Sequence, residues 1–320
     1  MPKELCHWMI AREAARRLDA TALSRTKAAV QTCPEAFLLG AVAPDGPFYV
    51  PKDARVVAIA RLLHGHGAVD AYAPVKRVIA AGSAGASVSP AAIALAAGVL
   101  CHFAADTIFH PAVFYITGFA AHASARVNDT YLFRHRIFES AMDLQLLTEY
   151  GDGLERRLDR LLARAQARPD AGELVAAVAR CYATSGQPLA AAEAASILDQ
   201  AGKTQKLFFS RTLRVLLRAR CIARSGKNAD LSALFYTRPA PSYFSPPRPY
   251  RDPVTGVDGV FELREFFSQA VQRTAWLCEH LERTLAGEAA AFPHPGPSLE
   301  SGHPLNQDQQ MKHCDPALEA

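Results

Sequence analysis

Three polar side chains that can bind a metal recur at four-residue intervals in an otherwise apolar stretch of the chain. The stretch reads CHFAADTIFHP over residues 101–111, and its polar members are His102, Asp106 and His110. Residues four apart on an α-helix lie about 40° apart around the axis, so all three face one way. Burying them among apolar residues is costly unless each finds a partner. A metal cluster would supply partners to all three together.

A second stretch, RHRIFES over residues 134–140, places His135 and Glu139 at the same spacing. Such a pair can direct two ligand atoms at one ion, as the paired histidines of zinc-protease helices do. Imidazole and carboxylate together suit zinc, with bonds of about 2.0–2.2 Å. The two stretches therefore predict two helices that together carry five candidate zinc ligands.

Three shorter pieces near the N-terminus carry side chains of the same kind. His7 lies on the first predicted helix, Asp45 lies in the turn-rich GAVAPDGPFY, and LLHGHG contains His64 and His66, of which only one is expected to bind metal. Each piece alone has an ordinary alternative: a core histidine, a capped turn or a solvated side chain. Their coincidence with the two helical stretches favours a metal cluster.

Taken in order, these pieces resemble the zinc-dependent phospholipase C family. That family includes bacterial phosphatidylcholine-hydrolysing enzymes and shares its fold with fungal single-strand-specific nucleases. The resemblance covers about residues 1–150 and rests on His7, GAVAPD, LLHG, HFAADTIFHP and HRIFE. It implies an all-α bundle with two or three Zn²⁺ ions at the bottom of a cleft, and hydrolysis of a phosphodiester by a metal-activated water.

The resemblance also implies a role for each position. Asp106 would bridge two zinc ions, one of them completed by His102 and by a histidine of LLHGHG, most simply His64. His7 would bind a third ion that shares Asp106. Asp45 would be the catalytic acidic residue beside the attacking water, where its carboxylate is the candidate general base. The ligands of a separate zinc site would be His110, His135 and Glu139.

Some features depart from the family pattern. In secreted members an N-terminal tryptophan binds zinc, whereas here Trp8 follows His7 and is expected to be a core aromatic. The spacing from Asp106 to His110 is tighter, and the gap from Asp45 to the histidine of LLHG is longer. The second half of the chain predicts helices rather than the β-sandwich domain of some toxins in the family.

The elements that must position these residues are predicted to be helical nearly throughout, so the expected fold class is all-α, a multi-helix bundle with a buried multinuclear metal site. Residues 34–51 and 237–256 are rich in proline and are expected to be mainly irregular. We expect one helical domain over 1–288 and a disordered tail over 289–320. Predicted helices cover 3–19, 21–31, 53–64, 68–81, 88–109, 130–150, 153–168, 170–184, 188–201, 203–224 and 260–287.

Bulk composition narrows the class of protein. The 320 residues include 35 Lys and Arg against 31 Asp and Glu, a net charge of +4 that gives no strong nucleic-acid signal.

Seven scattered cysteines without a C-x-x-C pair fit a reducing compartment, and no secretory leader pattern is present, so we expect a cytoplasmic protein. The apolar run 90–109 would bury His102 and Asp106 in hydrocarbon, so a buried helix is expected rather than a transmembrane segment.

The expected function is that of a zinc-dependent phosphoesterase, a hydrolase acting on a phospholipid or a soluble phosphodiester. Peripheral membrane contact stays open, although RRLDRLLARAQAR (156–168) is better explained as a solvated bundle face. One alternative is a nuclease with the same metal core, which would need stacking aromatics and a basic groove. Another is a non-catalytic metal-binding or structural protein. A di-iron bundle is disfavoured because it would want paired E-x-x-H motifs.

Overall fold

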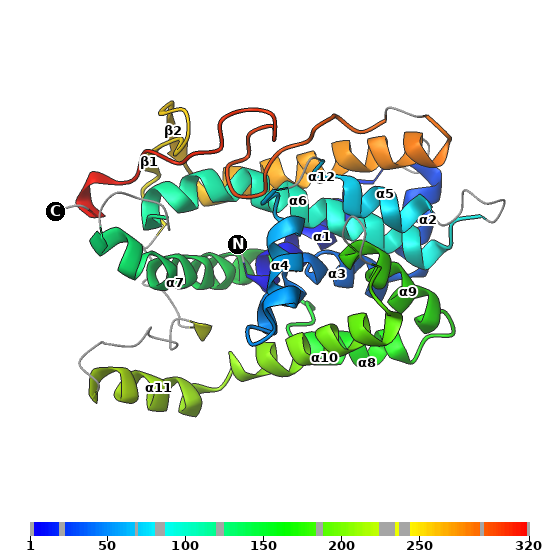
Figure 1. The fold of residues 1–320 in the computed structure, drawn as a ribbon, viewed down its shortest axis with the longest axis horizontal. Helices are drawn as coiled ribbons and strands as arrows, with labels where there is room; N and C mark the ends of the chain where they lie inside the picture. The colour runs from blue at the N-terminus through cyan, green and yellow to red at the C-terminus, as the bar shows by residue number, and fades with distance from the viewer. Residues whose placement is uncertain are drawn as a thin grey trace.

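The structure is a computed structural model that describes residues 3–18, 23–67, 70–80, 87–119, 125–183, 188–223, 234–236, 244–288 and 291–318, without the side chains of 125–130 and 221–223. The expected all-α class is confirmed, since helices make up most of these residues (Figure 1). Besides α1 (Glu4–Arg17) and α2 (Ser24–Thr32), the helices are α3 (Pro34–Gly40), η1 (Ala43–Tyr49), α4 (Ala54–Leu63), α5 (Ala73–Ala80), α6 (Pro90–Thr117), α7 (Ala125–Tyr150), α8 (Leu158–Gln166), α9 (Ala171–Tyr182), α10 (Ala191–Leu207), α11 (Arg211–Ala223), α12 (Leu263–Leu285) and η3 (Pro316–Leu318).

Helix α6 is the central element and is packed by α1, α2, α3, α5, α7, α9 and α12 (Figure 1). It begins at a proline, and the Ser89 hydroxyl caps it by accepting from the Ala92 N–H at 3.3 Å. It ends at Gly118, whose φ of +86° suits glycine. The helix is long and apolar enough to cross a membrane, but 89% of its apolar window is buried within the protein, as expected for a core helix.

Helix α6 is longer than predicted, because it continues through Pro111 to Thr117 instead of ending at residue 109. A proline inside a helix removes one N–H and therefore leaves the carbonyl four residues earlier, that of Thr107, without its helical donor. The continuation keeps His110 on the same helix as His102 and Asp106.

Helices α3 and α6 cross in direct backbone contact. A Cβ added to Gly98 would lie 2.1 Å from the Phe37 carbonyl oxygen, and one added to Gly40 would lie 2.3 Å from the Leu95 oxygen. Only glycine fits at both positions. The expectation that residues 34–51 are mainly irregular is wrong, because they form α3 and the 3₁₀ helix η1. Pro34 occupies the first turn of α3, where proline is tolerated, and so starts the helix instead of breaking it.

Two other segments are more regular than predicted. The proline-rich segment contributes β1 (Arg248–Arg251) to an antiparallel hairpin, whose second strand β2 (Asp258–Phe261) follows it and takes the first two residues of the helix predicted over 260–287. Residues 291–318, predicted as part of a disordered tail, lie packed on the helical body. The Phe292 ring stacks on Tyr72 with centroids 5.1 Å apart, and Leu299 is fully buried. A few apolar anchors and backbone hydrogen bonds order a segment whose composition is otherwise polar.

Candidate metal centre

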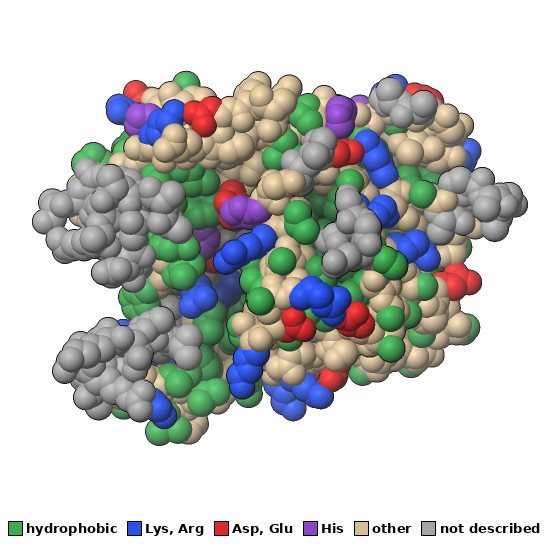
Figure 2. Space-filling model, viewed as in Figure 1, with side chains coloured by type: hydrophobic (Ala, Val, Ile, Leu, Met, Phe, Trp, Pro, Cys, Tyr) green, Lys and Arg blue, Asp and Glu red, His purple; other side chains and the backbone are tan. Residues whose placement is uncertain are grey.

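The eight candidate residues named from the sequence lie together in the interior of the helical bundle. They come from α1, η1, the C-terminal end of α4, α6 and α7, and all of them are buried. On the face drawn in Figure 2, some histidine and acidic side chains reach the surface beside the place of α4 in Figure 1, whereas the eight candidate residues lie beneath the surface. The eight are His7, Asp45, His64, His102, Asp106, His110, His135 and Glu139.

Four of these side chains form what we call the first ligand group: Asp45, His64, His102 and Asp106. Its His64 Nε2 lies 3.2 Å from Asp45 Oδ1, 3.5 Å from Asp106 Oδ2 and 3.4 Å from His102 Nε2. The last nitrogen lies 3.7 Å and 3.2 Å from the same two oxygens. A tetrahedral zinc ion places its ligand atoms about 3.3–3.6 Å apart, given bonds of about 2.0–2.2 Å. The group therefore has the size and donor set of a zinc site.

The two histidines of the first ligand group are oriented by backbone carbonyls. His64 Nδ1 donates to the Ala60 oxygen at 2.7 Å, and His102 Nδ1 donates to the Ala41 oxygen at 3.0 Å. A carbonyl can only accept, so each Nδ1 carries its hydrogen and each Nε2 is free to present a lone pair. This is the arrangement by which proteins orient metal-bound histidines. Ala41 directly follows α3, which explains why the close α3–α6 crossing matters to the site.

A second ligand group consists of His110, His135 and Glu139, whose ligand atoms all lie within 4.8 Å of one another. His135 Nε2 lies 2.9 Å from Glu139 Oε1, and His135 Nδ1 lies 3.3 Å from Thr117 Oγ1. His110 Nδ1 donates to the carbonyl oxygen of Leu299. The Nε2 atom of His110 is buried and has no hydrogen-bond partner among the described residues, as expected of a ligand facing an ion.

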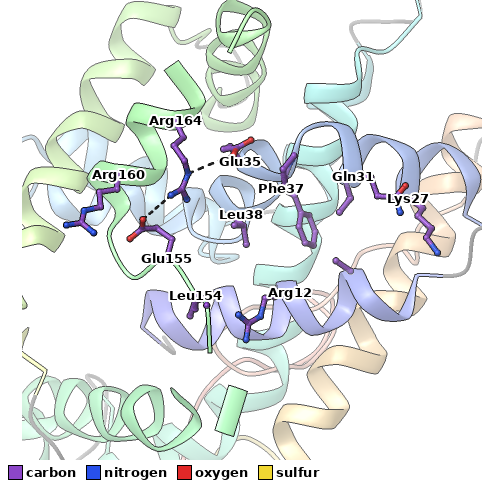
Figure 3. Close-up of a pocket in the computed structure, with 14 residues that line it drawn as sticks. Arg12, Lys27, Gln31, Glu35, Phe37, Leu38, Leu154, Glu155, Arg160 and Arg164 are labelled. Atoms are coloured by element: carbon purple, nitrogen blue, oxygen red, sulfur yellow. Dashed lines mark hydrogen bonds and ion pairs between the residues drawn. The ribbon is translucent and has the colours of Figure 1, made fainter. Parts of the chain in front are cut away.

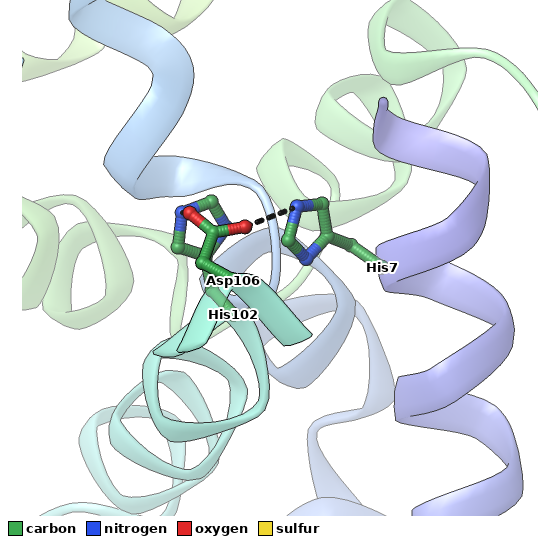
Figure 4. Close-up of side chains that lie close together, drawn as sticks. All are labelled: His7, His102 and Asp106. Atoms are coloured by element: carbon green, nitrogen blue, oxygen red, sulfur yellow. Dashed lines mark ion pairs between the residues drawn. The ribbon is translucent and has the colours of Figure 1, made fainter. Parts of the chain in front are cut away.

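His7 lies next to Asp106 (Figure 4), at the Asp106 oxygen other than the one near His64. Its Nε2 is 3.4 Å from Asp106 Oδ1, and its ring stacks on His102 with centroids 4.2 Å apart. The two oxygens of Asp106 thus face different partners, Oδ1 toward His7 and Oδ2 toward the first ligand group. That is the position of a bridging carboxylate. His7, His102 and Asp106 also offer ligand atoms within 4.8 Å of one another, so a third ion here would share His102 and Asp106 with the first ligand group.

The protonation states suit metal binding. Burial is the main cause that lowers the pKa of His7 and of His110 to about 3, so both imidazoles are neutral near pH 7. Burial opposes ionisation of Asp106, but His102 and His110 hold the pKa of that carboxyl well below its usual range. Burial also disfavours a charged His64, yet hydrogen bonds to Asp106 and Asp45 raise its pKa to about 10. An arriving cation must displace that proton.

Two neighbouring residues lie outside the ligand groups. His66 is half exposed and pairs with Glu300 at 2.8 Å, so of the two histidines in LLHGHG the geometry favours His64 as a ligand. Trp8 is buried and donates from Nε1 to the Leu38 oxygen at 2.9 Å, which is the core role expected for it.

Asp143 is a buried residue of the site region that the sequence reasoning missed. It accepts from the backbone N–H groups of Leu5 and Cys6 at 3.1 and 2.9 Å and thereby caps the start of α1. This contact fixes the helix that carries His7. The signal was available, because Asp143 follows Glu139 by four residues and so continues the ligand stripe of α7.

One groove among the described residues lies away from these side chains. It has a volume of about 750 Å³, lies between α1, α2, α3 and α8, and is lined by none of the eight candidate residues (Figure 3). Its charged groups are engaged with the protein: Arg164 pairs with Glu155 at 3.0 Å and with Glu35 at 3.9 Å. The metal chemistry therefore belongs to the buried cluster and not to this groove.

Fold and site together define an all-α protein with a buried multinuclear cluster of metal-ligating side chains. Residues 6–184, more than half of the chain, match the family model described as zinc dependent phospholipase C. The chain belongs to the zinc dependent phospholipase C family. The matched range contains all eight candidate residues and extends past the predicted residue 150 through α9. No curated protein and no solved structure matches the chain. Family membership supports a zinc phosphodiesterase in general.

Proposed function

We propose that the protein is a zinc-dependent phosphoesterase that hydrolyses a phosphodiester bond, in a phospholipid or in a soluble substrate. The observation that carries this proposal is the spacing in the first ligand group: the Nε2 atoms of His64 and His102 lie 3.2–3.7 Å from each other and from the nearest oxygens of Asp45 and Asp106. In these buried side chains, Asp45 Oδ1 and both oxygens of Asp106 have no hydrogen-bond partner among the described residues. Burying them so close together costs free energy of folding unless a cation lies between them.

The residues present fit Zn²⁺, because the donors are imidazole nitrogens and carboxylate oxygens held by outer hydrogen bonds. The first ligand group would hold one ion, the second would hold another, and His7 with Asp106 offers a place for a third. Bound zinc supplies electrostatic stabilisation of a phosphoryl oxygen and lowers the pKa of a water molecule.

Asp45 is placed to act on that water. Its side chain is 5% exposed, whereas those of His102 and Asp106 in the same group are fully buried, so Asp45 lies nearest to the solvent. Oδ1 of this carboxylate is counted among the donors of the first ligand group, and its other oxygen, Oδ2, would accept and orient the proton of an attacking water, which is the role of a general base. Asp106 stays ionised. Because its two oxygens face His7 and the first ligand group, it would keep these two parts of the cluster at a fixed distance from each other.

The nuclease alternative has less support. Of the aromatic side chains that could stack bases, Phe114 packs against His110 and His135 with centroids 5.3 and 4.9 Å away. Tyr49 donates its hydroxyl to Glu4. Phe114 is therefore part of the protein interior, and the half-buried Tyr49 has its hydroxyl engaged with the protein.

The test compares wild type with Asp45→Asn, and Asp199→Asn on the exposed face of α10 serves as control. Zinc per chain is measured first. Hydrolysis of a p-nitrophenyl phosphodiester and of phosphatidylcholine in micelles follows. We expect Asp45→Asn to lower kcat/KM by at least about 100-fold and the control to match wild type. Zinc-loaded wild type that hydrolyses neither substrate would favour the non-catalytic alternative, and single-stranded DNA as the preferred substrate would favour the nuclease.

A further inference from the structure

The C-terminal segment, defined here as residues 291–318, crosses the candidate metal centre although it lies outside the range matched by the family. In Figure 1 it returns from the end of α12 over α6 toward the end of the molecule that carries the β1–β2 hairpin. Its middle forms a short loop over residues 298–303, closed by hydrogen bonds from Ser298 N to the His303 oxygen at 2.8 Å and from Gly302 N to the Ser298 oxygen at 3.0 Å.

Within this loop, the backbone of Leu299 contacts both ligand groups. Its N–H donates to the carbonyl oxygen of His64 at 3.2 Å. Its own carbonyl oxygen accepts from His110 Nδ1. Leu299 is fully buried, so neither hydrogen bond competes with water. One residue of the C-terminal segment thus links a histidine of the first ligand group to a histidine of the second.

The hydrogen bond to His110 decides what that histidine can bind. Because the Leu299 carbonyl takes the hydrogen of Nδ1, Nε2 keeps its lone pair and faces His135 and Glu139. The histidines of the first ligand group obtain the same orientation from carbonyls of α4 and of the residue after α3. For His110 the orienting carbonyl comes from the other end of the chain.

The loop can lie this close because one backbone carbonyl of α6 lacks its helical hydrogen bond. Pro111 has no N–H, so the Thr107 carbonyl has no helical donor, and the backbone of Gly302 lies against it. A Cβ on Gly302 would lie 2.8 Å from the Thr107 oxygen and 3.3 Å from Pro111 Cγ, and the φ of Gly302 is +73°. On the other side of the loop, Glu300 pairs with His66 at 2.8 Å. The close approach therefore depends on the proline beside His110 and on one glycine.

We propose that Leu299 is a positioning residue of the metal centre, and that the second ligand group binds zinc at full strength only while the C-terminal segment is docked on α6. This inference rests on the proposed zinc site. It assigns the centre a component beyond residue 184, held in place by Gly302.

The test uses the full chain with Gly302→Ala, which pushes the loop off α6. Gly287→Ala is the matched control, since Gly287 also has a positive φ of +93° but a Cβ there would meet nothing within 4 Å. Both variants carry similar backbone strain, and only one disturbs the docking. His135→Ala provides a reference protein in which the second ligand group is broken directly. Zinc per chain, zinc affinity and the absorption spectrum of the cobalt-substituted protein are measured together with circular dichroism.

We expect Gly302→Ala to weaken zinc at the second ligand group by about 10- to 100-fold, as losing an orienting hydrogen bond does, with helix content unchanged. Its cobalt spectrum should resemble that of His135→Ala, whereas Gly287→Ala should match wild type. If wild type binds zinc and Gly302→Ala binds it as tightly as Gly287→Ala, the inference is overturned while the proposed function stands. Wild type that binds no zinc overturns both.

Discussion

His64 and His102 lie 38 residues apart in the chain, yet their Nε2 atoms are 3.4 Å apart in the core, with both Nδ1 atoms donating outward to carbonyls. Two such nitrogens can share a buried site only with a positive charge between or upon them. A proton on His64, whose pKa is raised to about 10, meets that need when no ion is bound. This relationship explains why α4 and α6 meet here, and it requires the proton to leave when a cation enters.

The crossing of α3 and α6 predicts an unusual response to a helix-favouring change. In an ordinary helix, Gly→Ala stabilises by about 1 kcal/mol. At Gly98 the new Cβ would lie 2.1 Å from the Phe37 oxygen, so we expect Gly98→Ala to lower the free energy of unfolding by about 1–3 kcal/mol. Gly172→Ala in α9, with nothing within 4 Å, is the control and should be neutral or stabilising. Urea unfolding followed by circular dichroism measures both, and equal stability of the two variants would contradict the close crossing.

The His7→Ala variant tests how the zinc ions are distributed among the ligand groups. The first and second ligand groups, as defined above, do not include His7, whose ligand atoms lie instead near those of His102 and Asp106. We therefore expect His7→Ala to keep two zinc ions per chain and to lose only an ion held between His7 and Asp106. Native mass spectrometry counts the ions on each chain. Fewer than two remaining ions would show that His7 belongs to one of the two main sites.

The capping of α1 by Asp143 predicts that the free energy of unfolding depends on pH. Burial, with the nearby Glu4 as second cause, raises the pKa of Asp143 from 3.8 to about 7. The folded state then holds a proton that the unfolded state has released, so this residue's contribution to stability is full below about pH 4 and is lost as pH rises toward 7. The slope is at most about 1.4 kcal/mol per pH unit. Asp143→Asn removes the titration, so its stability should fall less than that of wild type over this range, as measured by urea unfolding at several pH values. Equal slopes would contradict the assignment.

Local spacing was enough to predict the ligand-bearing stretches. His102, Asp106 and His110 lie on one helix, and His135 with Glu139 on another, because four-residue spacing survives any packing of the helices around them. The family resemblance added the order of the pieces and the roles of residues such as Asp45. Their convergence in the structure agrees with that prediction, while their metal-binding roles stay proposals.

What the sequence did not predict depends on contacts between distant segments. Helix α3 was missed because Pro34 was taken as a breaker, although it starts the helix that crosses α6 at Gly40. The ordered C-terminal segment was missed because its composition is polar, and its docking depends on Leu299 and Gly302 meeting α6. The capping role of Asp143 on α1 likewise joins residues far apart in the chain, which local periodicity cannot reveal.

The central claim is a zinc cluster bridged by Asp106, and it is tested most directly by the zinc content of purified wild type and Asp106→Ala, measured by mass spectrometry with protein concentration determined in parallel. Both oxygens of Asp106 face candidate ligands, at 3.4 Å from His7 and 3.2 Å from His102. We predict two or three zinc ions per wild-type chain and at least one fewer in the variant. Wild type without zinc, or a variant that retains the full wild-type content, would contradict the account.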